Sequence, residues 1–186
     1  MKKCTVWLFC FILLTGCAKQ PEGIEIGMEL RSKLLQAKSC SFEAEITADY
    51  GDKIQTFVMH CISDPAGDIT FTVRKPDSIS GISGKLTGEG GKLTFDETAL
   101  HFELMAEEQL SPISAPWIFL KTLRSGYLTS ACLEDNVAHL SIDDSYAENT
   151  LQLDIWLDFQ KLPKHAEILH DSRRILSLDV INFTIL

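Results

Sequence analysis

The chain has 186 residues, of which 45% are hydrophobic, enough for one domain with a sizeable core. Its 26 acidic residues outnumber its 17 Lys and Arg residues, and the formal net charge is −9. A surface this acidic repels phosphate backbones and anionic lipid headgroups, which argues against nucleic-acid binding and against a polybasic membrane contact.

Residues 1–16 have the pattern of a signal peptide. Lys2 and Lys3 form a basic start, and the apolar run VWLFCFILL follows at 6–14. This run is too short to cross a hydrocarbon core of about 30 Å as a helix. We therefore expect a segment that directs export and is then removed.

The sequence LTGC at 14–17 resembles the bacterial lipobox. The resemblance implies cleavage after Gly16 and attachment of a diacylglycerol to the thiol of Cys17, with palmitate-type chains that hold the protein on a membrane. Residues 17–23 are then the lipidated cysteine and a polar tether, and residues 24–186 are the folded domain. The expected location is extracytoplasmic, at the cell membrane or, in a Gram-negative host, the outer membrane. The alternative is a conventional secretory protein with an incidental cysteine.

An amphipathic helix is predicted at 24–39, because apolar residues recur there at helical spacing. We expect one side of this helix to pack on the domain. That side is expected to contain Ile24, Met28 and Leu35, with Leu30 and Leu34 adjoining.

From residue 41 the pattern changes to that of strands. SFEAEITAD at 41–49 alternates apolar and polar residues, YGDK turns the chain, and IQTFVMHCI at 54–62 returns as an antiparallel partner. Similar segments continue to the end of the chain, apart from SPISAPWIFLKTLRSG at 111–126, which predicts a short central helix. The expected class is mainly β (α+β): one curved antiparallel sheet, or incomplete β-barrel, of about 11 strands with two helices.

Several stretches of this pattern resemble the lipoprotein-carrier superfamily of periplasmic LolA and LolB, and more closely the Gram-positive lipoproteins of sporulation and germination. The resemblance rests on patterns of apolar residues, Gly and Pro over nearly all of the chain after the signal peptide. It implies a LolA-like incomplete barrel around helices, with an apolar cavity that holds acyl chains in the carrier members. The matching stretches are SCSFEAEIT, RKPDSISGISGKL, KLTFDETAL, LSPISAPWIFLKTL, IWLDFQKLPKHAEI and LDVINFTIL.

A cavity of this kind predicts a set of lining residues. Two helices are too few to cover the apolar face of a sheet with so many strands, so this concave face either closes on itself or leaves a cavity. The alternative for the central helix is plain core packing against the sheet. The candidate lining residues are Phe42, Ile46, Phe71, Phe102, Ile113, Trp117 and Leu120.

Three cysteines remain besides Cys17, namely Cys40, Cys61 and Cys132. Cys40 and Cys61 form a disulfide only if the turn at residues 50–53 sets them directly opposite; in the other register they lie on a diagonal that is unfavourable for a bond. Free thiols are the favoured expectation.

The histidines and acids of the chain form none of the common catalytic or metal-binding motifs. The five histidines stand in no H-x-x-x-H or H-E-x-x-H frame, and no G-x-S-x-G or S-x-x-K motif occurs. The acid-rich segment SIDDSYAEN at 141–149 is expected to be a solvated turn, the alternatives being a weak calcium site or a partner contact. The sequence therefore predicts no catalytic residue, no cofactor and no metal.

These observations predict a tethered, non-catalytic protein of the cell envelope. The first hypothesis is a binding partner or adaptor of an envelope protein; the resemblance to germination-type lipoproteins implies a peptidoglycan (cortex) amidase, and a homodimer by strand exchange is a further expectation. The alternative is a carrier or acceptor of lipid or lipoprotein acyl chains. A roomy apolar cavity would favour the carrier, and a filled core with an accessible edge strand would favour the protein partner.

Overall fold

The computed structural model describes residues 22–51, 53–95, 98–103, 105–106, 109–135, 137–147 and 150–186. The predicted signal peptide, Gly16 and Cys17 lie outside the described residues, so the lipidation site stays a prediction. None of the described helices is long and apolar enough to cross a membrane.

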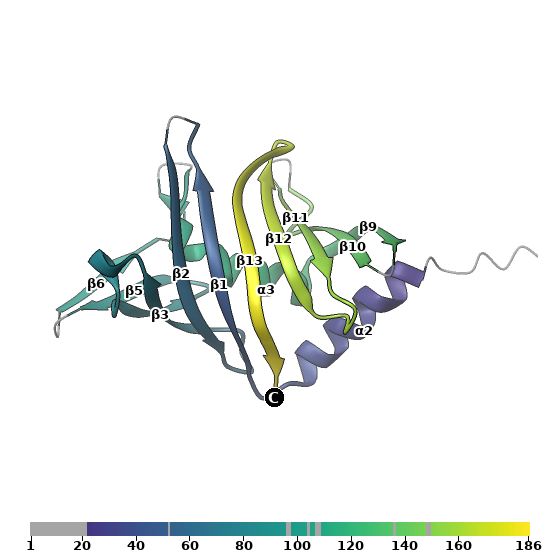
Figure 1. The fold of residues 1–186 in the computed structure, drawn as a ribbon, viewed down its shortest axis with the longest axis horizontal. Helices are drawn as coiled ribbons and strands as arrows, with labels where there is room; N and C mark the ends of the chain where they lie inside the picture. The colour runs from purple at the N-terminus through teal and green to yellow at the C-terminus, as the bar shows by residue number, and fades with distance from the viewer. Residues whose placement is uncertain are drawn as a thin grey trace, which may run out of the picture.

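One antiparallel sheet of 11 strands dominates the fold, in the order β6-β5-β4-β3-β2-β1-β13-β12-β11-β10-β9 (Figure 1). The predicted sheet of about 11 strands with two helices is thus confirmed. Its strands are β1 (Cys40–Asp49), β2 (Ile54–Ser63), β3 (Ile69–Lys75), β4 (Ser83–Thr87), β5 (Gly90–Phe95), β6 (Thr98–Phe102), β9 (Tyr127–Glu134), β10 (Val137–Asp143), β11 (Leu151–Leu157), β12 (Pro163–His170) and β13 (Arg173–Ile185).

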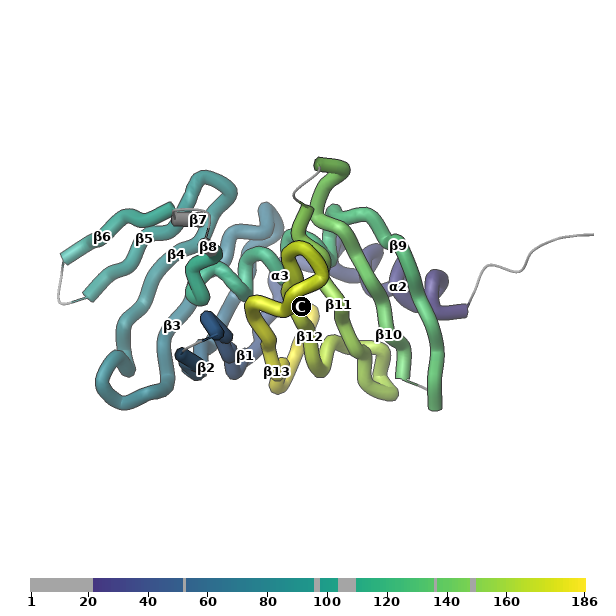
Figure 2. The backbone as a smooth tube through the Cα atoms, turned by 90° about the horizontal axis from the view of Figure 1, so that it is seen from above, coloured from purple at the N-terminus to yellow at the C-terminus, as the bar shows by residue number. Residues whose placement is uncertain are grey.

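The first and last strands meet in the middle of the sheet. β1 pairs with β13 on one side and with β2 on the other, so β6 and β9 are the two edges. Viewed from above, the strands form an arc around α3 (Ala115–Ser125), with β6 and β9 at opposite ends (Figure 2). The described residues also form a short strand pair and two 3-10 turns. The strands are β7 (Met105–Ala106) and β8 (Gln109–Leu110), and the turns are η2 (Asp77–Ile79) and η3 (Pro112–Ser114).

The centre of the arc is filled by side chains from both layers. Phe119 of α3, Phe42 of β1 and Phe183 of β13 form an aromatic cluster with ring centroids 5.4–6.3 Å apart. Phe42 and Phe119 are completely buried. The alternating segment predicted at 41–49 therefore forms a strand whose apolar residues face α3, and 151–157 forms another of the same kind.

Helix α2 (Glu22–Gln36) packs through a face that overlaps the predicted one only at Leu30 and Leu34. Its buried residues are Gly23, Ile26, Gly27, Leu30 and Leu34, whereas Met28 and Leu35 are 50% and 57% exposed. A Cβ atom on Gly27 would stand 3.1 Å from Leu140 Cδ1, so the glycine lets the helix lie close to β10. The prediction was right for Leu30 and Leu34 and wrong for Met28 and Leu35, because the side that approaches the sheet is the one on which Gly23 and Gly27 leave room.

Candidate functional site

A row of apolar residues runs across the concave face from the core to the β6 edge. Phe71 of β3 pairs in register with Gly84 of β4, Gly84 with Leu93 of β5, and Leu93 with Leu100 of β6. Residues directly opposite in antiparallel strands lie on one face, so all four belong to the concave side. Exposure rises along this row, from 1% at Phe71 to 61% at Leu100.

Two further aromatic residues belong to this exposed end. Phe95 lies two residues beyond Leu93 on β5, hence on the same face, and is 59% exposed. Phe102 faces Gly91 across the β5–β6 pair; a side chain on that glycine would overlap the Phe102 ring, so the missing Cβ lets the ring lie over β5. Together these four residues are called the apolar wing: Leu93, Phe95, Leu100 and Phe102.

The apolar wing exists because the sheet is wider than its cover. α3 packs beneath the central strands, and β4 to β6 continue the sheet beyond it (Figure 2). Burial of a large apolar side chain contributes about 1.5–3 kcal/mol, and Phe95 and Leu100 forgo much of this within the described residues. An exposed apolar surface continuous with a core is the usual mark of a binding surface.

The predicted lining residues divide into two groups. Phe42, Ile46, Phe71 and Leu120 are at most 1% exposed and belong to the packed core. Phe102, Ile113 and Trp117 are half-buried and pack against the margin of that core. Only the second group reaches the surface, and the sequence pattern did not single out Leu93, Phe95 and Leu100, which accompany Phe102. Whether the predicted set lines a ligand cavity stays a prediction.

Cys40 and Cys61 are both buried and free, and no bond joins them. Cys61 faces Phe42 and Cys40 faces Ser63, which is the predicted register that sets the two cysteines on a diagonal. The thiol of Cys40 contacts the Ser63 hydroxyl at 3.0 Å. Burial raises the pKa of the Cys61 thiol far above its ordinary value, and the neighbouring Cys40 raises it further.

This environment predicts selective thiol chemistry in residues 22–186, which contain only Cys40, Cys61 and Cys132. We expect iodoacetamide to modify Cys132 alone in the native protein, since Cys132 is exposed and the other two thiols are buried and protonated. Unfolding in guanidinium without reductant should then release all three for labelling, as counted by mass spectrometry. A single reactive thiol after unfolding would show that Cys40 and Cys61 are bonded.

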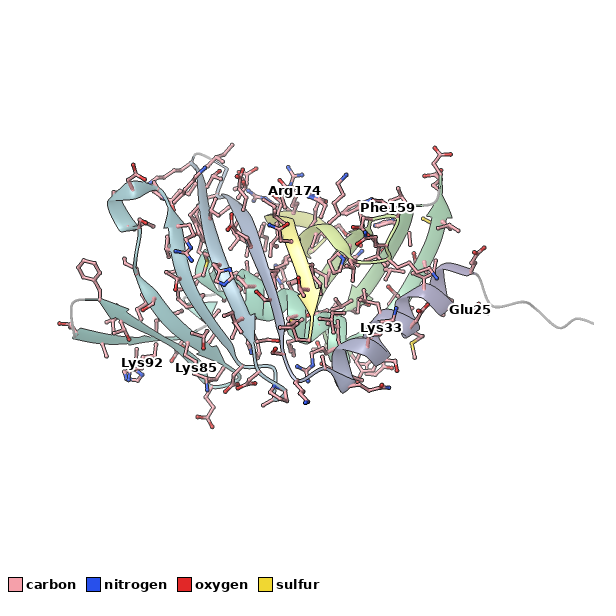
Figure 3. All side chains as sticks on the ribbon, turned by 60° about the horizontal axis from the view of Figure 1, so that its bottom comes forward. Glu25, Lys33, Lys85, Lys92, Phe159 and Arg174 are labelled. Atoms are coloured by element: carbon pink, nitrogen blue, oxygen red, sulfur yellow. The ribbon has the colours of Figure 1, made fainter. Side chains whose placement is uncertain are left out.

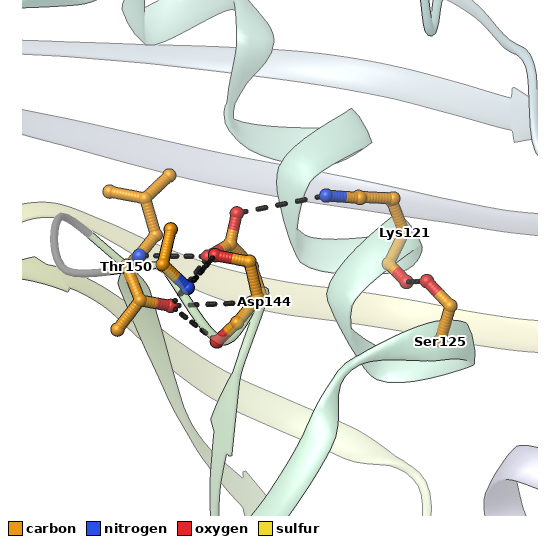
Figure 4. Close-up of polar contacts among 7 residues, drawn as sticks. Lys121, Ser125, Asp144 and Thr150 are labelled. Carbon is orange, nitrogen blue, oxygen red and sulfur yellow. Dashed lines mark hydrogen bonds and ion pairs between the residues drawn. The ribbon is translucent and has the colours of Figure 1, made fainter.

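The acidic segment after β10 ties a loop to the central helix (Figure 4). One carboxylate oxygen of Asp144 accepts hydrogen bonds from the Thr150 hydroxyl at 2.8 Å and from the Leu151 amide at 2.9 Å. Its other oxygen lies 3.6 Å from Nζ of Lys121 on α3. The Asp144 side chain is only about one-sixth exposed. Its contacts hold the loop in place, so it is not a freely solvated acid. Among the described residues no group of three or more His, Cys, Asp or Glu is arranged to hold a metal.

Fold and surface together define a class: an open, curved antiparallel sheet with helices on its concave side and an apolar surface at one end. No family model matches the sequence, and no curated protein matches it. The sporulation and germination subtype and the absence of catalysis stay predictions.

Solved structures of similar chain path exist. A LolA superfamily protein from Nitrosomonas europaea is 11% identical, with 88% of this chain and 93% of that chain covered and a TM-score of 0.49. The Mycobacterium tuberculosis lipoprotein LppX is 12% identical, with 86% and 95% covered and a TM-score of 0.40. The MucA/MucB complex of Pseudomonas aeruginosa contains a chain that is 12% identical, with 88% and 56% covered and a TM-score of 0.40. Each is a likeness of chain path, and none assigns a ligand or an activity to this chain.

Proposed function

We propose that this chain is a membrane-tethered, non-catalytic lipoprotein that accepts an acyl chain, or a similar apolar group, on the apolar wing. The observation that carries the proposal is the exposure of Phe95 (59%) and Leu100 (61%) on a face that is otherwise the core. An acyl chain laid along Leu93, Phe95 and Leu100 would remove this surface from water at no cost in unpaired polar groups. Side chains fill the space between α3 and the central strands, so the Phe42 cluster has no room for a ligand and the apolar wing is the surface that can bind it.

The test measures binding of a fluorescent fatty acid to residues 22–186. We expect saturable binding that Phe95→Ser together with Leu100→Ser weakens at least about 10-fold, since two anchors of the ligand are lost. Ile62→Ser is the matched control. Ile62 of β2 is 47% exposed and lies on the face of the sheet opposite the apolar wing. Equal binding by the double variant and the control would refute the wing as the ligand site.

A protein partner is the second candidate function. It is favoured by the filled core together with the edge strand β6, the combination expected of a protein-binding member. β6 pairs with β5 on one side, and no described strand pairs with its other side. Such an edge accepts an extended segment of another chain, or of a second copy by strand exchange. The narrower prediction of a cortex amidase in sporulation or germination rests on the sequence resemblance alone.

Affinity purification of the full-length protein from its native membrane separates the two candidates. Lipid recovered without a stoichiometric protein supports the acceptor. A stoichiometric envelope protein without bound lipid supports the adaptor, and its identity decides whether the amidase prediction stands.

A further inference from the structure

A second surface lies on the convex face, on the opposite side of the sheet from the apolar wing. A groove of about 390 Å³ is bounded there by Val137 of β10, Trp156 of β11 and Phe159 of the turn after β11. Phe159 is 83% exposed and Val137 is 41% exposed. Phe159 lies at the far end of the sheet from Lys85 and Lys92 of β4 and β5 (Figure 3).

Trp156 is held in place by its neighbours across the strands. It pairs in register with His139 on β10 and with His165 on β12, so the three rings share the convex face. The His139 ring stacks on Trp156 at 4.4 Å between centroids, and the His165 ring stands at 5.2 Å. His165 is itself fixed by Asp179 of β13, at 2.7 Å. The wall of the groove is therefore preorganised, which lowers the entropic cost of binding.

Carboxylates predominate around this groove. Asp135 and Asp158 line it, together with one cation, Lys164. Further acids stand on the same convex face of the neighbouring strands. Glu167 is paired with Arg174 at 2.7 Å and Asp179 with His165 at 2.7 Å, and Asp154 lies 4.0 Å from His139. These further acids are Asp154, Glu167 and Asp179. The surface thus attracts positive charge and repels negative charge.

We propose that this groove binds a basic segment of another protein, with one apolar side chain of that segment anchored between Trp156 and Phe159. Aromatic residues in a preformed groove are typical energetic centres of protein interfaces, and the surrounding acids select the charge of the partner. This site is independent of the apolar wing, because it lies on the other face of the sheet and on other strands. The protein would then hold an apolar ligand on its concave side and a protein on its convex side.

Tryptophan fluorescence provides a direct test. The chain has three tryptophans, so Trp7→Phe with Trp117→Phe in the full-length protein leaves Trp156 as the sole reporter. This protein, in nonionic detergent, is titrated with three synthetic peptides: a Lys/Arg-rich peptide with a central Phe, the same peptide with Ser in place of Phe, and an Asp/Glu-rich peptide with the Phe. We expect a saturable change in Trp156 emission with the first peptide and at least about 10-fold weaker binding of the other two.

Variants in the same background locate the site. Phe159→Ser should weaken the basic peptide at least about 10-fold, since an exposed anchor is removed without disturbing the core. Asp135→Asn should weaken it less and flatten its salt dependence. Leu100→Ser on the apolar wing is the control and should leave peptide binding unchanged while impairing the fatty acid. Equal binding of the acidic peptide, an unaffected Phe159→Ser variant, or no saturable binding below about 1 mM would each overturn the proposal.

Discussion

Phe119→Ala is expected to lower the free energy of unfolding by about 3–5 kcal/mol, the cost of a large cavity at a completely buried aromatic site. Phe119 has 0% exposure and is the residue of α3 that joins the aromatic rings of β1 and β13. Its loss removes the contact with Phe42 at 5.7 Å and with Phe183 at 6.3 Å together. Because most domains have only about 5–15 kcal/mol in total, this variant should be largely unfolded at modest urea concentrations.

Urea denaturation of residues 22–186, followed by far-UV circular dichroism, measures this loss. Phe159→Ala is the matched control, since it removes the same side chain from a site that is 83% exposed. The control should change stability by no more than about 0.5 kcal/mol. A loss below about 1 kcal/mol in Phe119→Ala would mean that α3 does not complete the core. A filled core would then no longer exclude the ligand and leave only the apolar wing to bind it.

The strands were the most predictable part of this fold. In 41–49 apolar and polar residues alternate strictly, and in 151–157 Leu or Ile occupies every second position. A strand with one buried and one wet face is the structure that satisfies such a pattern. The width of the sheet followed from the number of these segments. Their order did not, because the pairing of β1 with β13 joins the two ends of the chain and leaves no local signal.

Helix α2 shows where periodicity misleads. The stripe of Ile24, Met28 and Leu35 has the spacing of a buried face, yet Gly23 and Gly27 mark the side that contacts the sheet. A hydrophobic pattern is dominated by large apolar side chains, whereas a helix can approach strands closely only where its side chains are small. The signal in the sequence is the pair of glycines four residues apart, Gly23 and Gly27, which marks the face of the helix that packs on the sheet.

The candidate surfaces depend on coverage, which no local pattern contains. Phe71 and Leu100 lie in one row on one face, yet Phe71 belongs to the packed core and Leu100 lies beyond its margin. The convex groove did leave a trace in the sequence. In LQLDIWLD at 151–158, Trp156 alternates with the apolar residues in phase with Asp154 and Asp158, and a tryptophan among acids on a solvent face is a reason to expect a binding surface.

Cys17→Ala should release the protein from the membrane fraction and abolish incorporation of radioactive palmitate. The proposed function requires this result, because each buried CH₂ of an acyl chain contributes about 0.8 kcal/mol to attachment. Two or three chains hold a protein firmly, and the acidic surface offers no electrostatic substitute. Cys132→Ala is the control: its exposed thiol lies in the folded domain, and its loss should change neither labelling nor fractionation.

The same lipid would also decide how the apolar wing meets its ligand. α2 begins at Glu22, and the residues from Cys17 to that point span at most about 17 Å when fully extended. On so short a tether the proposed lipid would keep the domain beside the bilayer, where it would act as a stationary acceptor and not as a free shuttle. If Cys17→Ala stays in the membrane fraction and keeps its palmitate label, the anchor lies elsewhere and this geometric constraint disappears. If it is released and still takes up fatty acid on the wing, anchoring and ligand binding are separate properties of the chain.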